Sequence, residues 1–139
     1  MKNLLLFLVI FKSMVFIGQN IEKHQWKNRV LLIFTDDKNA DDFKDQIKVL
    51  SKEKEGLVER KLVVYQFTKN DFRVDFNEVW TSSNSLHRKY VNIHDSFKVL
   101  LLGLDGGVKL EQNKVLSLEK LFTIIDGMPM RRSELKRKN

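Results

Sequence analysis

The sequence predicts a single α/β domain built on a mixed sheet, and two patterns predict it. Two continuous apolar runs, 29–35 and 62–67, flank a segment with helical spacing, as in a parallel βαβ unit. A later strand, glycine turn and second strand at 97–110 precede a capped helix, as in an antiparallel hairpin followed by a helix. With 139 residues, 42% of them hydrophobic, the chain has room for one ordinary core.

The first pattern gives the centre of the sheet. Residues 29–35 read RVLLIFT, an apolar run typical of a strand buried on both faces. After a polar loop, Phe43, Ile47 and Leu50 fall on one face of a helix that we expect to end near Gly56 as its C-terminal cap. The crossover to 62–67 is long enough to be right-handed, so the two strands should be parallel.

The middle of the chain carries weaker patterns. Apolar residues alternate with polar ones at 72–76, which favours a short additional edge strand. Residues 83–90, with Leu86 and Tyr90 four apart, favour a short helix.

The last third predicts a hairpin and a helix. Residues 97–102 and 108–110 have strand patterns, and Asp105-Gly106-Gly107 between them tolerates the positive φ of a tight turn. A helix should begin after the N-cap residue Ser117 and end at Gly127 and Pro129. Its apolar stripe consists of Leu118, Leu121, Phe122 and Ile125. The whole order is therefore β-α-β-α-β-β-α.

This order is the thioredoxin-like architecture, a mixed four-stranded sheet covered by helices. Four segments add a closer resemblance: WKNRVLLIF at 26–34, ERKLVV at 59–64, LLGLDGGVKL at 101–110 and IDGMPMRRSE at 125–134. In them the chain resembles a bacterial thioredoxin-like family known only as a domain of unknown function. That family is similar to peroxiredoxin-like modules of extracellular sushi-repeat proteins. Leu104 departs from the pattern, which has a lysine before Asp-Gly-Gly.

Residues 1–19 predict an export signal. Lys2 precedes the apolar run 4–11, and Lys12 interrupts it well short of the roughly 20 residues that span a bilayer. Cleavage would follow Gly18, although Phe16 occupies a position that prefers a small residue. A buried N-terminal helix or strand is the alternative. We therefore expect a periplasmic or secreted protein, with an uncleaved membrane anchor left open, and a domain at 20–130 followed by a basic tail at 131–139.

Removal of the signal would lower the formal net charge from +7 to +5, because Lys2 and Lys12 leave with it. Much of the remaining excess lies in the tail, where only Glu134 opposes the cations Arg131, Arg132, Lys136, Arg137 and Lys138. A solvated tail is the simplest interpretation, and anion binding is the alternative. The tail lacks interleaved aromatic residues, which argues against a nucleic-acid partner.

The chain contains no cysteine, which excludes disulfides, thiolate nucleophiles, iron–sulfur centres and thiolate zinc sites. Thioredoxin-like redox enzymes carry their cysteines between the first strand and the following helix. Residues 35–42 here read TDDKNADD. The proline that precedes the third core strand of those enzymes is also missing, since residues 93–97 read IHDSF. The resemblance therefore does not imply thiol chemistry.

The acidic loop invites comparison with a calcium site. Asp37, Asn39 and Asp41 match the first three ligands of a calcium loop, but Asp42 replaces the turn glycine and Lys48 the bidentate glutamate. Acids at a helix start also interact favourably with the helix dipole, so we expect no metal and no other cofactor.

The three histidines, His24, His87 and His94, are expected at the surface, and none completes a catalytic triad. No catalytic residue is therefore assigned.

Three functional hypotheses remain. The first is a non-redox binding or structural module with an unknown protein or peptide partner. The second is an enzyme that uses carboxylates of the loop Asp36–Asp42, and the third is anion binding through the basic tail. The candidate interaction surface follows the last predicted helix and consists of Met128, Pro129, Met130, Arg131 and Arg132.

Overall fold

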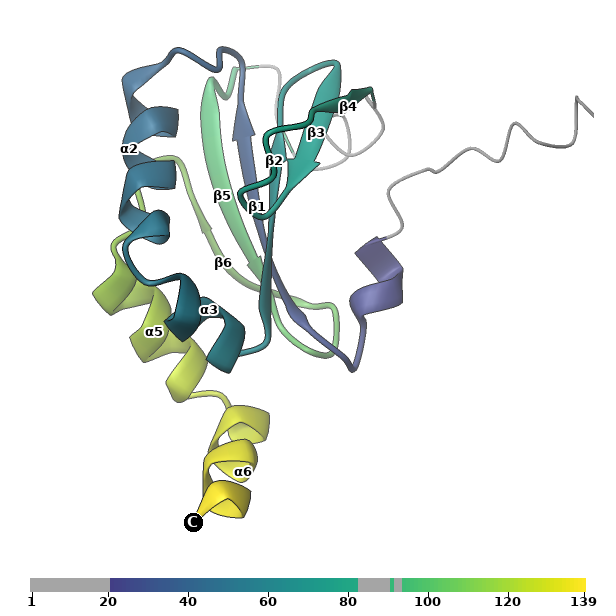
Figure 1. Cartoon of the computed structure of the whole chain (residues 1–139), viewed down its shortest axis with the longest axis vertical. Coiled ribbons are helices and arrows are strands. Elements are labelled where there is room, and N and C mark those ends of the chain that lie inside the picture. The colour runs from purple at the N-terminus through teal and green to yellow at the C-terminus, as the bar shows by residue number, and fades with distance from the viewer. Residues whose placement is uncertain (1–20, 83–90, 92–93) are drawn as a thin grey trace, which may run out of the picture.

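The computed structural model describes residues 21–82, 91 and 94–139, which form a six-stranded mixed sheet of order β4-β3-β2-β1-β5-β6 (Figure 1). The elements are η1 (Ile21–His24), β1 (Arg29–Thr35), α2 (Asp41–Ser51), α3 (Lys54–Glu59), β2 (Leu62–Phe67), β3 (Asp71–Val74), β4 (Thr81–Ser82), β5 (Phe97–Leu102), β6 (Val108–Gln112), α5 (Leu118–Asp126) and α6 (Pro129–Lys138).

β1 lies in the middle of the sheet, as its continuous apolar run predicts. It pairs in parallel with β2, starting with Arg29 opposite Leu62, and antiparallel with β5, where Val30 lies opposite Leu102. All seven of its residues are buried. The predicted βαβ unit and the β5–β6 hairpin are therefore confirmed.

The sheet has six strands rather than the four we predicted. The alternation at 72–76 produces β3, which ends at Val74 and leaves Phe76 in the following loop. β4 extends the same edge by two exposed residues, Thr81 and Ser82, a pairing too short and too polar to show as a sequence pattern. The predicted short helix at 83–90 lies outside the described residues.

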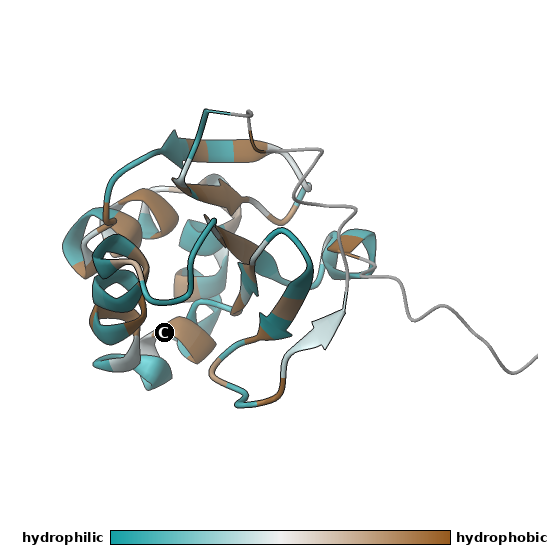
Figure 2. Ribbon diagram, turned by 90° about the horizontal axis from the view of Figure 1, so that it is seen from above, coloured by the Kyte–Doolittle hydropathy of each residue, from teal (hydrophilic) through white to brown (hydrophobic). Residues whose placement is uncertain are grey.

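Helices α2, α3 and α5 cover one face of the sheet (Figure 1). The core on that face includes Leu31, Leu50, Leu57, Leu121 and Ile125, drawn from strand and helices together. The opposite face carries a second buried cluster, in which stacked rings follow the strands: Phe34, Tyr65, Phe67 and Phe72. Figure 2 shows the hydrophobic residues concentrated in the strands and on the inward sides of these helices.

The prediction that Gly56 caps the first helix is wrong. The chain forms two helices here, and Gly56 lies inside the second, α3. A Cβ atom on Gly56 would lie 3.0 Å from the Cζ atom of Phe122 on α5. Glycine thus allows α3 and α5 to approach closely.

The predicted turn and helix ends of the last third are confirmed. Gly106 has φ +80°, and Asp105 accepts a hydrogen bond from the Gly107 amide through Oδ1. Ser117 Oγ accepts from the Lys120 amide at the start of α5, and Gly127 follows its last residue.

Residues 131–138 are helical and largely exposed to solvent, with Arg131 buried and Glu134 half-buried. Pro129 occupies the first turn of a further helix, α6, which continues to Lys138 and extends below the sheet in Figure 1. Pro129 ends one helix and also begins another, because its fixed φ suits a first helical turn. No helix in the described parts of the chain is both long and apolar enough to cross a membrane.

Candidate functional site

The loop at the C-terminal end of β1 occupies the position where thioredoxin-like enzymes carry their cysteines. Lys38 Nζ lies 2.7 Å from Asp71 Oδ2 and 4.0 Å from the ring centroid of Trp80. The guanidinium of Arg73 lies 4.8 Å from the same centroid. Ion pairing and cation–π contacts therefore fasten this loop to β3 and to Trp80.

The carboxylates of this loop point to different partners. Asp37 Oδ1 accepts a hydrogen bond from the Asn39 amide at 2.8 Å, and Asp36 lies 3.8 Å from Lys69. Asp41 and Asp42 lie in the first turn of α2, where the helix dipole favours them. Among the residues that the structure describes, no three histidine or acidic side chains gather to hold a metal ion.

Asp71 completes the polar contacts at this end of the sheet. Burial opposes ionisation of its carboxyl group, but hydrogen bonds from Lys38 and Thr68 outweigh that effect and hold its pKa below the ordinary value.

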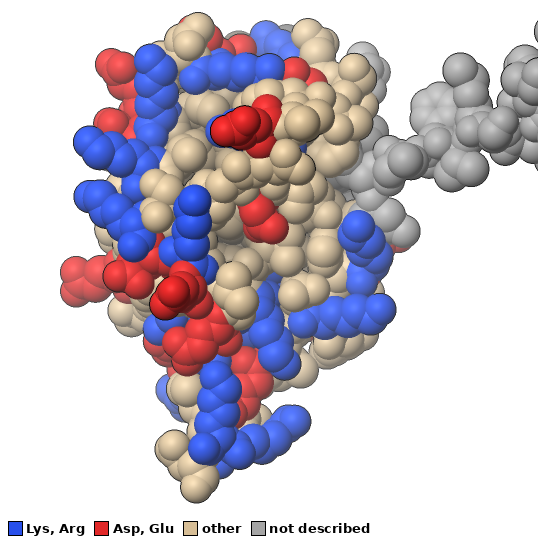
Figure 3. All heavy atoms as spheres, in the orientation of Figure 1, with Lys and Arg blue, Asp and Glu red and all other residues tan. Residues whose placement is uncertain are grey.

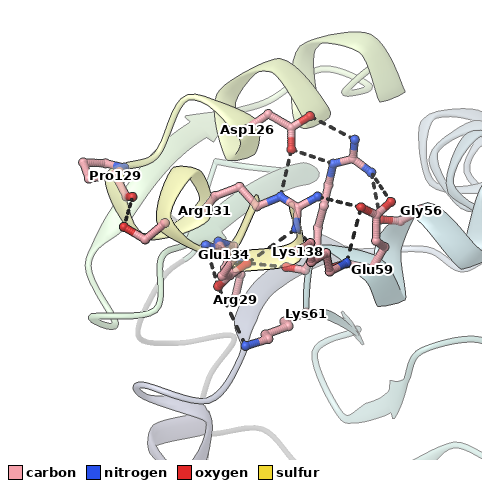
Figure 4. Close-up of polar contacts among 11 residues, drawn as sticks. Arg29, Gly56, Glu59, Lys61, Asp126, Pro129, Arg131, Glu134 and Lys138 are labelled. Carbon is pink, nitrogen blue, oxygen red and sulfur yellow. Dashed lines mark hydrogen bonds and ion pairs between the residues drawn. The ribbon is translucent and has the colours of Figure 1, made fainter. Parts of the chain in front are cut away.

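The opposite end of the sheet holds a dense ionic cluster, which we call the α6 network: Arg29, Glu59, Arg60, Lys61, Asp126, Arg131, Glu134 and Lys138 (Figure 4). Its members come from the start of β1, the α3–β2 connection, the end of α5, and α6. Cations outnumber carboxylates in it.

Arg131 is the centre of the α6 network and is only 1% exposed. Its Nε donates to Asp126 Oδ1 at 3.1 Å, and its Nη2 donates to Glu59 Oε1 at 2.9 Å. Nη1 lies 3.5 Å from Glu134 Oε2. The hydrogen bond and charge of Arg131 lower the pKa of Glu59. One guanidinium therefore joins carboxylates from three helices.

Arg29 is the second buried cation and has no exposed surface. Its Nη1 donates to the Arg60 carbonyl oxygen at 2.9 Å, and Nη1 and Nη2 each lie 3.4 Å from Glu134. Its Nε has no hydrogen-bond partner in the part of the chain that the structure describes. Glu134 thus lies between two buried arginines. Its carboxylate compensates positive charge that would otherwise be buried without a partner.

Arg60 connects the network to the helical layer. It donates to both carboxylate oxygens of Asp126, at 3.0 and 2.9 Å, and its guanidinium stacks 3.8 Å from the Phe122 ring centroid. Burial raises the pKa of Asp126, but hydrogen bonds from Arg60 and Arg131 outweigh it and leave the pKa below its ordinary value.

The residues of the predicted interaction surface differ in exposure. Met128 packs against the core, whereas Pro129 and Arg132 are exposed and Met130 is 43% exposed. Arg131 points inward and pairs with Asp126 across the helix turn. Pro129, Met130 and Arg132 are therefore the members of the predicted surface that are open to a partner.

Sequence reasoning missed Arg29, Glu59, Arg60 and Glu134. A signal was present, because all four lie within the segments that carry the family resemblance at 26–34, 59–64 and 125–134. His24 also differs from expectation, since its Nε2 lies 2.7 Å from the Tyr65 hydroxyl and the ring is half-buried rather than fully at the surface.

A pocket of about 340 Å³ lies beside the α6 network, which we call the α3–β2 pocket. It is lined by Asn28, Lys54, Leu57, Val58, Lys61, Leu62, Val63, Asp75 and Phe76. Figure 3 shows a hollowed, mostly uncharged surface above and to the right of α3, with an acidic side chain inside it and both basic and acidic side chains along its border. The pocket therefore lies at the end of the sheet opposite the β1–α2 loop.

Comparisons with known proteins agree with this fold. No curated protein matches the chain. Among solved structures, a reduced 2-Cys peroxiredoxin from Plasmodium vivax aligns with a TM-score of 0.59 at 15% sequence identity, over 81% of this chain and 72% of that chain. That likeness concerns the thioredoxin-like fold alone. The model of the family described as "Domain of unknown function (DUF4174)" matches residues 20–134, and the chain therefore belongs to that family.

Proposed function

We propose that this protein is an exported, non-redox binding module that uses a thioredoxin-like scaffold to hold a protein or peptide partner. One observation carries the proposal: the fold is retained although the sequence has no cysteine, and Lys38, Asp71 and Trp80 fasten the loop where a thiol would act. A scaffold without its reactive group retains surfaces for binding.

Export is supported by the sequence pattern of residues 1–19. The test is mass spectrometry of the protein from separated cell fractions. We expect the envelope or medium to contain a chain that begins after Gly18. Full-length protein confined to the cytoplasm would contradict export.

Partner binding is tested by changing exposed apolar residues to aspartate one at a time. Suitable positions are Trp26, Val79, Val108 and Met130, which are exposed and lie on different parts of the surface. We expect most variants to capture the same partner as the wild-type protein. Variants changed at the contact surface should capture less of it. Capture that no variant reduces would contradict a specific surface.

Redox assays supply the complementary test. The purified protein should neither reduce hydrogen peroxide nor cleave a disulfide substrate, because each reaction in a thioredoxin-like enzyme depends on a thiolate. Turnover by the cysteine-free protein would overturn the proposal.

A second candidate function, anion binding, is supported by the outer face of α6. Arg132, Lys136 and Arg137 are exposed there, and none has an ion-pair partner among the described residues, while Arg131 and Glu134 face inward. Each Lys or Arg side chain close to an anionic membrane surface contributes about 1 kcal/mol to the binding free energy.

The test is sedimentation with phosphatidylglycerol vesicles, with phosphatidylcholine vesicles as the control. A triple variant, R132Q/K136Q/R137Q, removes the outer cations and leaves Arg131 and Glu134 in place. Binding should be lost in this variant and should weaken as NaCl rises from about 50 to about 300 mM. Equal sedimentation with both lipids would exclude this function.

A further inference from the structure

The α3–β2 pocket combines an apolar lining with an unusually exposed apolar lip. Leu57 and Leu62 are buried, and Val63 and Phe76 are half-buried along the same lining. Val58 is 75% exposed at its border. A side chain of this kind gains stability when a ligand covers it, since burial removes apolar surface from water.

The charges around the pocket favour an anion. Lys54 and Lys61 line it, and Lys54 Nζ lies 4.7 Å from the ring centroid of Phe76. Lys61 Nζ is 3.9 Å from Glu134, at the outer limit of an ion pair. The carboxylate of Asp75 is directed to the backbone, because its Oδ1 accepts a hydrogen bond from the Val64 amide at 3.0 Å.

Two lining residues hold an uncommon backbone conformation. Lys61 has φ +51° and Asp75 has φ +53°. Residues other than glycine are less stable at a positive φ, and residues with such strained backbones are frequent at ligand sites. Lys61 directly follows the C-cap residue of α3, where this conformation commonly ends a helix, and the conformation of Asp75 accompanies its contact with the Val64 amide.

We propose that the α3–β2 pocket binds a small amphipathic monocarboxylate, with its carboxylate at Lys54 and Lys61 and its hydrocarbon body against Leu57, Val63 and Phe76. A volume of about 340 Å³ lies at the small end of the range for ligand pockets, so a medium-chain acid suits it. This inference rests on the proposed binding function, because it names a ligand for a binding module that has no cysteine for thiol chemistry.

The test uses octanoate as the probe and the complete mature protein. Titration followed by amide chemical shifts should give saturable binding, with the largest shifts at Leu57, Val63 and Phe76. Lengthening the acid from hexanoate to octanoate should tighten binding by about four-fold per methylene group that enters the pocket. Octylamine, which has the same body and the opposite charge, should bind at least about ten-fold more weakly, because two of the three charged lining residues are lysines and the carboxylate of Asp75 is hydrogen-bonded to the Val64 amide.

Matched variants localise the effect. V58D places a carboxylate at the exposed lip and should abolish octanoate binding, whereas V108D makes the same change at an exposed valine of β6 and should leave it unchanged. K54M should weaken the binding of octanoate more than the binding of octanol, and K48M on α2 is its control. Each variant is first shown to unfold at the same urea concentration as the wild type.

Three results would overturn the inference: no saturable binding, equal binding of octylamine, or octanoate binding that V58D does not reduce. These outcomes leave the proposed function standing if the aspartate scan still finds a partner surface. Failure of that scan together with octanoate binding would instead indicate a small-molecule carrier with no protein partner.

Discussion

The two ends of the sheet differ in how deeply their charged side chains are buried. At the β1–α2 loop, the Lys38–Asp71 pair is partly exposed, with 41% and 24% of the two side chains accessible. In the α6 network, the side chains of Arg29 and Arg131 are 0% and 2% exposed, and Glu134 is 12% exposed. Exposed pairs contribute at most about 1 kcal/mol, whereas a buried charge that loses its partner destabilises a fold strongly. The loop end of the sheet should therefore contribute less to stability than the end that holds the α6 network.

The largest expected effect comes from Arg131→Ala. The change removes the guanidinium that joins three carboxylates, and it should lower the free energy of unfolding by about 3 kcal/mol. Urea denaturation measures it. Arg132→Ala is the matched control on the same helix, and because Arg132 is exposed it should change stability by less than about 0.5 kcal/mol. Equal effects of the two variants would show that α6 is not anchored by burial.

A double-mutant cycle tests whether Glu134 compensates buried charge. Glu134→Gln alone should destabilise the protein by about 2 kcal/mol, because Arg29 and Arg131 then share no carboxylate. Combining it with Arg29→Met removes one of the buried cations as well. The double variant should be more stable than the sum of the single effects by at least about 1 kcal/mol, and simple additivity would contradict direct coupling.

Acid should affect both ends of the sheet. The pKa values of Glu59 and Asp126 in the α6 network and of Asp71 near the loop are lowered from 4.5, 3.8 and 3.8. A lowered pKa in the folded state contributes stability that is complete above the ordinary value and is lost as pH falls through the lowered value. Urea midpoints should therefore decline below about pH 4.5.

Asparagine variants assign this acid sensitivity to the two ends. Asp126→Asn should flatten the decline more than Asp71→Asn, since two guanidiniums stabilise Asp126 whereas one ammonium and one hydroxyl stabilise Asp71. The reverse order would locate the main acid-sensitive contacts at the loop.

The smallest expected effect is that of Lys38→Ala. It should lower the free energy of unfolding by less than about 1 kcal/mol, because the ion pair is exposed to solvent. The loss of the ammonium above the ring should still shift the fluorescence of Trp80, measured in a Trp26→Phe background. An unchanged spectrum would contradict the cation–π contact.

Local patterns were sufficient for most of the fold. β1 and β2 are continuous apolar runs, Ser117 caps a helix with an apolar stripe, and Gly106 supplies the positive φ of its turn. Each of these signals lies within about ten residues of chain. The second edge pairing was missed because Thr81 and Ser82 have no periodicity to detect.

The α6 network was not predictable in the same way. The helix itself has almost no apolar face, and its basic composition favours solvent, so nothing local shows that Arg131 is buried. Its burial depends on carboxylates from α3 and α5, and the partner of Arg29 is supplied by α6. Contacts between separate elements become visible only when the fold brings them together.

The separation of Arg29 and Glu134 also bears on the order of events during folding. Glu134 is synthesised 105 residues after Arg29, and chains emerge from the ribosome starting at the N-terminus. Until then β1 can enter the sheet only with an uncompensated arginine at its start. We therefore expect the start of β1 to reach its full stability only after α6 has been made and Glu134 has reached Arg29.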